Sequence, residues 1–145
     1  MSKASVGSEI ISAGIDEIAL ALFAIESYPN WTDGITKVSD VRRNSKGDID
    51  LATLTIDAGV IQDEITLEYD WSGAPGRLNF RAIKGKFLKK MDGAYILESL
   101  NPNSTRVTYE LSVSISGLIP QFMITNQEKV TITRALVQLK EYVER

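Results

Sequence analysis

Residues 105–143, TRVTYELSVSISGLIPQFMITNQEKVTITRALVQLKEYV, decide the fold, because their hydrophobic period changes from two to about 3.6. Val107, Tyr109 and Leu111 alternate with polar residues, which predicts a strand with one buried and one solvated face. The proline at position 120 suits the first turn of a helix, where its missing amide is harmless. The pattern therefore predicts a long strand, then a helix over residues 120–143 that covers a sheet.

The predicted helix carries one row of residues spaced by three and four positions, which we expect to face the sheet. This row is Thr125, Lys129, Ile132, Leu136, Leu139 and Val143. Its carboxyl-terminal part is apolar and its amino-terminal part is more polar. We therefore expect the surroundings of the helix to change about halfway along it.

Upstream of residue 105 the period of two recurs, and turn residues separate the segments. We expect strands over residues 6–12, 35–43, 49–58, 61–71, 78–86 and 94–100, and turns at Ser45–Asp48, Ala58-Gly59, Gly73–Gly76, Met91-Asp92-Gly93 and Asn101–Asn103. A helix begins near Ile15 and ends before Tyr28-Pro29, followed by a short second helical turn. Short connections favour antiparallel neighbours, so the prediction is an α+β fold of about seven antiparallel strands curved around the last helix.

Composition limits the functions that the chain can have. It has 145 residues, 43% of them hydrophobic, and contains neither cysteine nor histidine. We therefore expect a single domain over residues 1–145, no metal site and no cofactor, with any catalysis left to carboxylates, lysine, tyrosine or hydroxyls. The net charge of -3 with mixed signs argues against nucleic-acid binding. Without a signal-like or membrane-spanning segment, we expect a cytoplasmic protein, monomeric or weakly dimeric.

Several segments in this order resemble the START-like (SRPBCC) superfamily, in the polyketide cyclase/dehydrase and lipid-transport family common in actinobacteria. They are Glu9–Ala13 with Asp16–Ile18, Tyr28–Trp31, Thr105–Leu111, Ile119–Phe122, Ala135-Leu136 and Leu139-Lys140. The chain departs from the family at Gly14, where proline or serine is usual. The resemblance implies a helix-grip fold with a cavity for lipids, polyketides, quinones or similar apolar molecules, and it does not select one function.

Two groups of residues are candidates for ligand binding in that cavity. The first is the aromatic set Trp31, Tyr69, Trp71, Phe80, Phe87, Tyr95, Tyr109 and Phe122. The second is Thr125, Lys129 and Ile132 on the last helix, with Lys129 as a possible partner for a ligand carboxylate. For any single aromatic residue we favour packing in the core, although we expect several of the set to face a cavity. For Lys129 we favour extension into water.

Charged clusters have simpler explanations. Glu64, Glu68 and Asp70 fall on the solvated face of one strand, whereas Asp63 either begins a frayed strand or is a buried acid, and we favour the first. Lys84, Lys86, Lys89 and Lys90 surround a turn at Gly85, where they keep the hairpin soluble or contact anionic lipid headgroups transiently. We expect binding or transport of a hydrophobic molecule; the alternatives are an aromatase/cyclase-like enzyme and a protein-interaction module.

Overall fold

The computed structural model describes residues 4–57 and 62–145. Its elements are β1 (Ser5–Ile11), α1 (Ile15–Phe23), the 3-10 helix η1 (Ile25–Asn30), β2 (Ile35–Arg43), β3 (Ile49–Asp57), β4 (Gln62–Asp70), β5 (Arg77–Lys84), β6 (Leu88–Asn101), β7 (Ser104–Ile115) and α2 (Gln121–Val143). The predicted α+β class, the first helix and the short second turn are confirmed. The turn expected at Ala58-Gly59 and the strand position of Ile61 lie outside the described residues.

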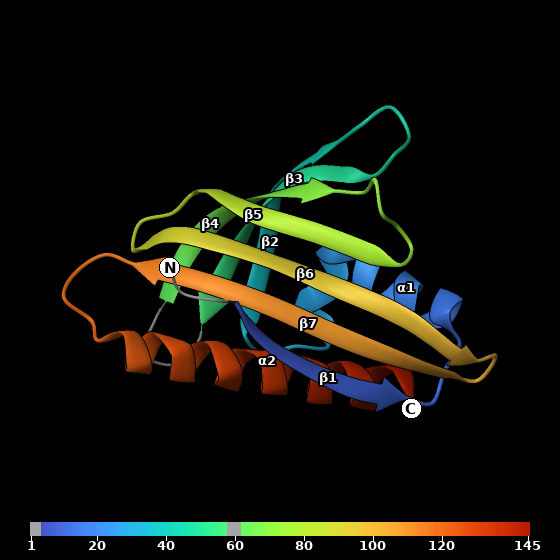
Figure 1. Ribbon diagram of the computed structural model, residues 1–145. Helices are drawn as coiled ribbons and strands as arrows, with labels where there is room; N and C mark the ends of the chain where they lie inside the picture. The colour runs from blue at the N-terminus through green and yellow to red at the C-terminus, as the bar shows by residue number, and fades with distance from the viewer. Residues whose placement is uncertain (1–3, 58–61) are drawn as a thin grey trace.

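The seven strands form one antiparallel sheet in the order β1-β7-β6-β5-β4-β3-β2. Every neighbouring pair except β1 and β7 is joined by a short connection, and β1 returns to the sheet beside the last strand. Figure 1 shows α2 running along one face of the curved sheet, with α1 near its carboxyl-terminal end. The core lies between that inner face and the helices, which is the helix-grip arrangement.

The buried face of α2 differs from the predicted one in its amino-terminal half. Ile124, Glu128, Ile132, Leu136 and Leu139 are the buried residues. Lys129 is exposed, so the prediction that it faces the sheet is wrong, whereas Thr125 is partly exposed. The reason is that the buried acid has partners on the strands. The carboxylate of Glu128 accepts hydrogen bonds from the Ser5 hydroxyl and from the amide of Val113, both at 2.7 Å. A lysine side chain has no acceptor for these donors.

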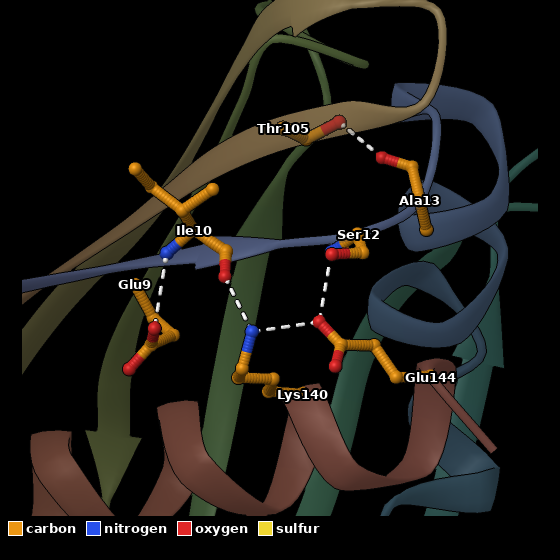
Figure 2. Close-up of polar contacts among 7 residues, drawn as sticks. All are labelled: Glu9, Ile10, Ser12, Ala13, Thr105, Lys140 and Glu144. Carbon is orange, nitrogen blue, oxygen red and sulfur yellow. Dashed lines mark hydrogen bonds and ion pairs between the residues drawn. The ribbon is translucent and has the colours of Figure 1, made fainter.

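The carboxyl-terminal end of α2 is held to β1 by two charged side chains (Figure 2). Lys140 Nζ donates to the carbonyl of Ile10 at 2.7 Å and pairs with Glu144 at 2.7 Å. Glu144 in turn accepts the backbone amide of Ser12 at 2.8 Å. These contacts fix the helix at one end, whereas its first turn exposes Gln121, Phe122 and Met123.

The turn expected at Met91-Asp92-Gly93 is wrong, because these residues lie inside β6. Gly93 pairs with Phe80 across β5 and β6, and a Cβ there would lie 2.3 Å from the Phe80 ring. The glycine therefore makes room for an aromatic ring on the inner face and does not mark a turn. The turn lies between β5 and β6 instead, around Gly85.

Candidate functional site

A small cavity lies between the inner face of the sheet, η1 and the middle of α2. This main cavity has a volume of about 80 Å³. Its lining comprises Tyr28, Trp31, Thr32, Gly34, Ile35, Ile56, Asp57, Met91, Tyr95, Tyr109, Gln127, Val130, Thr131, Arg134 and Ala135. The lining is mostly apolar with a few polar groups, as is usual for sites that bind small organic molecules.

A second cavity of about 50 Å³ lies farther toward the amino-terminal end of α2. This side cavity is lined by Ile56, Leu88, Met91, Leu111, Val113, Ile115, Ile124, Gln127, Glu128 and Thr131. Ile56, Met91, Gln127 and Thr131 line both cavities. The two spaces are therefore neighbours that share part of their walls.

An aromatic layer on the inner face of four neighbouring strands borders the main cavity. Tyr69, Phe80, Tyr95 and Tyr109 come from β4, β5, β6 and β7, and all four side chains are buried. The rings of Tyr95 and Tyr109 are closest, with centroids 4.3 Å apart, and Phe80 lies 6.1–6.3 Å from the other three. Alternation along each strand places these rings on one face, and cross-strand register brings them into contact.

The buried tyrosine hydroxyls differ in their hydrogen bonds. Tyr28 donates to the carbonyl of Leu22, and Tyr95 and Tyr109 hydrogen-bond to each other. The hydroxyl of Tyr69 is buried and has no partner among the described residues. Tyr95 and Tyr109 therefore present a paired phenol edge to the main cavity, and Tyr69 lies behind it.

Burial keeps these phenols neutral. It raises the pKa of Tyr28, Tyr69 and Tyr95 well above the ordinary value, because the phenolate would lose its hydration. Burial also raises the pKa of Tyr109, to about 12, while its hydrogen bond with Tyr95 opposes the rise. At neutral pH the cavity wall thus offers neutral hydroxyls and no phenolate.

Polar groups gather on the side of the main cavity formed by α2 and the segment after η1. Thr131 and Arg134 line it from α2, and Thr32 lines it from the segment after η1. Arg134 lies 3.7 Å from the carboxylate of Asp33, and both side chains are substantially exposed. The cavity therefore runs from an aromatic interior to a polar, partly solvated rim, which suits an amphipathic molecule.

The structure separates the predicted ligand-binding residues into three groups. Trp31, Tyr95 and Tyr109 line the main cavity. Tyr69, Phe80 and Ile132 are buried near it but do not line it. The remaining residues lie elsewhere. Trp71 packs against Phe23, and its indole nitrogen donates to the Ile49 carbonyl, while Thr125 accepts a hydrogen bond from Gln121 on the same helix. Phe87, Phe122 and Lys129 are exposed.

The sequence prediction does not include most of the residues that line the two cavities, and Tyr28 and Glu128 are examples. Tyr28 was interpreted as part of a helix-ending segment, although its buried ring lines the main cavity. Glu128 is missed because the row of three- and four-residue spacings runs through Lys129. Two steps of four residues back from Ile132 reach Glu128 and then Ile124. This spacing is the sequence pattern that could have predicted the buried face.

The acidic cluster does not form a metal site. No group of three or more potential metal ligands occurs among residues 4–57 and 62–145. Asp63 is buried within β4, which is the alternative that we did not favour from the sequence. Its carboxylate accepts the amides of Glu64, Lys86, Phe87 and Leu88 at 2.8–3.2 Å, so it holds the β5–β6 turn in place.

A groove on the outer face of the sheet is larger than either cavity but chemically unsuited to an apolar ligand. It has a volume of about 540 Å³ and is lined by charged side chains from β4 to β7. Arg77 pairs with Glu110 at 3.0 Å, and Arg81 pairs with Glu68 at 2.9 Å. These charged side chains form ion pairs with each other and are exposed to water. We therefore place the candidate site for an apolar ligand on the inner face.

Comparison with sequences gives no relative of known function: no family model matches the chain, and no curated protein matches it. Solved structures do match. A START superfamily protein from Mycobacterium smegmatis is similar with a TM-score of 0.92, at 17% identity, over 99% of this chain and 98% of that one. The Zhui aromatase/cyclase from Streptomyces sp. R1128 is similar with a TM-score of 0.78, at 15% identity, over 99% and 94% of the two chains.

A protein from Thermus thermophilus is similar with a TM-score of 0.83, at 14% identity, over 97% of this chain and 96% of that one. The chain therefore has the START-like fold that the sequence predicted. Among its described residues, no helix is both long and apolar enough to span a bilayer.

Proposed function

We propose that this protein binds or transports a hydrophobic or amphipathic small molecule, such as a lipid, polyketide or quinone, between the sheet and α2. The observation that carries the proposal is the main cavity, where the paired hydroxyls of Tyr95 and Tyr109 meet a mostly apolar wall. Burial of the apolar part of the ligand would supply the affinity, at about 25 cal/mol per Å². The polar rim near Thr131 and Arg134 would orient it. We further propose that the protein is a cytoplasmic monomer or weak dimer and that it binds this molecule without a cofactor.

The size of the cavity sets a condition on this function. A space of about 80 Å³ holds only a small fragment, since an engineered cavity of about 150 Å³ takes up benzene. A larger ligand needs the main and side cavities to merge. The first turns of α2 are the part that can give way, because Ile124 is the first buried residue of the helix while Lys140 and Glu144 hold its other end.

Native mass spectrometry of freshly purified protein tests the proposal directly, by searching for a small molecule that copurifies. The variant Thr131→Leu should fill space that borders both cavities and displace the molecule. Thr133→Leu is the matched control, because Thr133 lies on the exposed side of the same helix. A copurifying molecule retained by the control and lost in Thr131→Leu supports the proposal. Equal retention in both variants contradicts the cavity as its site.

An aromatase/cyclase-like enzyme is the second candidate, because the similar fold of the Zhui protein serves such an activity. Lys129 cannot act in the main cavity, since it lies on the exposed side of α2. Tyr109, neutral at physiological pH with a pKa near 12, could donate a proton or a hydrogen bond but is a poor base. Turnover of a polyketide substrate that Tyr109→Phe abolishes without loss of binding would favour the enzyme.

We also propose transient contact with an anionic membrane at one end of the molecule. Phe87, Leu118, Phe122 and Met123 are exposed there, and the amide of Ser116 donates to the carbonyl of Phe87, joining the β5–β6 turn to the β7–α2 connection. Figure 1 shows both connections at the same end.

Lys84, Lys86 and Lys89 are exposed and have no ion pair among the described residues, whereas Lys90 pairs with Asp92. Apolar side chains beside unpaired lysines fit a surface of anionic lipids.

A further inference from the structure

The two tryptophans of the chain differ in the hydrogen bond of the indole nitrogen. Trp71 Nε1 donates to the carbonyl of Ile49 at 2.7 Å. Trp31 Nε1 is buried and has no hydrogen-bond partner among the described residues. Buried polar groups are paired in the great majority of cases, so an unpaired indole N–H in a cavity wall calls for an explanation.

The position of the Trp31 ring is fixed by its neighbours. Its backbone amide donates to the Tyr28 carbonyl at 3.1 Å at the end of η1. The Tyr28 ring meets the indole edge to face at 5.4 Å, and the Tyr142 ring stacks on it at 6.3 Å. The side chain is held on two sides and lines the main cavity, and its unpaired N–H lies within the buried part of that wall.

An indole N–H donates and cannot accept, so its partner must be a hydrogen-bond acceptor. The hydroxyls of Tyr95 and Tyr109 bond to each other. Among the described residues that line the main cavity, Arg134 is the one cation, and it is half-exposed beside Asp33. A buried anionic acceptor would thus lack a buried counter-charge, which favours a neutral oxygen.

We propose that Trp31 Nε1 donates a hydrogen bond to a neutral oxygen, a carbonyl or an ether, on the ligand of the main cavity. This inference rests on the proposed small-molecule binding and narrows its ligand class from any apolar compound to compact oxygen-bearing ones. The aromatic layer receives the hydrocarbon part of the ligand, and Trp31 fixes its orientation.

The test uses two small probes of equal heavy-atom number, cyclopentanone and methylcyclopentane. The indole N–H signals of Trp31 and Trp71 are followed by ¹H–¹⁵N NMR during each titration. Cyclopentanone should shift the Trp31 indole proton downfield and leave that of Trp71 unchanged, and methylcyclopentane should bind without that shift. One net hydrogen bond predicts about five-fold tighter binding of the ketone.

Trp31→Phe keeps an apolar ring but removes the donor, so the preference for the ketone should disappear while hydrocarbon binding remains. Trp71→Phe should leave the preference intact. If both probes perturb the Tyr95 and Tyr109 signals with equal affinity and the Trp31 indole signal does not move, the inference is overturned and small-molecule binding stands. If neither probe perturbs the cavity signals, the proposed function itself fails.

Discussion

The carboxylate of Glu128 on α2 accepts a hydrogen bond from the hydroxyl of Ser5 on β1 at 2.7 Å, although 123 positions separate them in the chain. The same carboxylate accepts the amide of Val113 on β7. One buried acid therefore joins the helix to β1 and β7, the two neighbouring strands at one edge of the sheet, beside the side cavity.

Replacing Glu128 should destabilise the protein according to how many partners lose their acceptor. Glu128→Ala leaves a hydroxyl and an amide unpaired, at about 1–3 kcal/mol each, whereas Glu128→Gln keeps an acceptor oxygen and should cost less. Urea denaturation of the two variants and of Ser5→Ala gives the free energies of unfolding. A Glu128→Ala protein as stable as the wild type would contradict this role.

The tyrosines of the aromatic layer should respond differently to loss of a single hydroxyl. Tyr95→Phe breaks the bond to Tyr109 and should cost about 1 kcal/mol of stability. Tyr69→Phe removes a buried hydroxyl without a partner and should be neutral or stabilising. Both variants keep the ring, so chemical denaturation compares the hydroxyls alone. Equal losses in the two variants would show that Tyr69 has a partner in solution.

The inner face of the strands could be predicted from the sequence because alternation alone assigns it. Tyr69, Tyr95 and Tyr109 share the parity of the aliphatic residues beside them, and all three are buried together. The helix was harder, because positions 128 and 129 both lie within a stripe that an amphipathic helix can bury. Which of them turns inward depends on Ser5 and Val113, more than a hundred residues and 15 residues away.

The same limit applies to Gly93, which looks like a turn residue until its partner across the ladder is known to be Phe80. Trp31 was identified as a candidate from its residue type, but no local pattern reveals that its N–H lacks a partner while that of Trp71 has one. Long-range contacts decide both cases, and a single sequence does not display them.

Asp63 should make stability depend on pH in the acidic range. Burial raises the pKa of its carboxyl, but the four backbone amides that it accepts outweigh this effect and lower the pKa below its ordinary value. A lowered folded-state pKa means that the stabilisation is present above the unfolded-state pKa and is lost as pH falls through the folded-state pKa. Asp63→Asn should therefore lose stability at neutral pH, by about 1.5–3 kcal/mol, and lose less near pH 3.

Urea denaturation at the two pH values measures that difference. Glu64→Gln is the matched control, because the Glu64 side chain is next to Asp63 in the chain but is exposed and accepts none of the turn amides. If the Asp63→Asn deficit is as large at acidic as at neutral pH, the carboxylate does not act through its charge.

Membrane contact should depend on the lysines around the β5–β6 turn and not on the net charge of the protein, which is negative. Each lysine near an anionic surface contributes about 1 kcal/mol, so the double variant Lys86→Gln/Lys89→Gln should weaken binding to phosphatidylglycerol-containing vesicles about thirty-fold. Lys37→Gln/Lys46→Gln changes the charge equally from exposed positions in β2 and the β2–β3 turn, and should have little effect.

Vesicle cosedimentation measures the binding of both double variants, and added salt should weaken binding of the wild type. Binding that persists in the first variant, or that is as strong to vesicles of neutral lipid, would contradict an electrostatic membrane surface at this end.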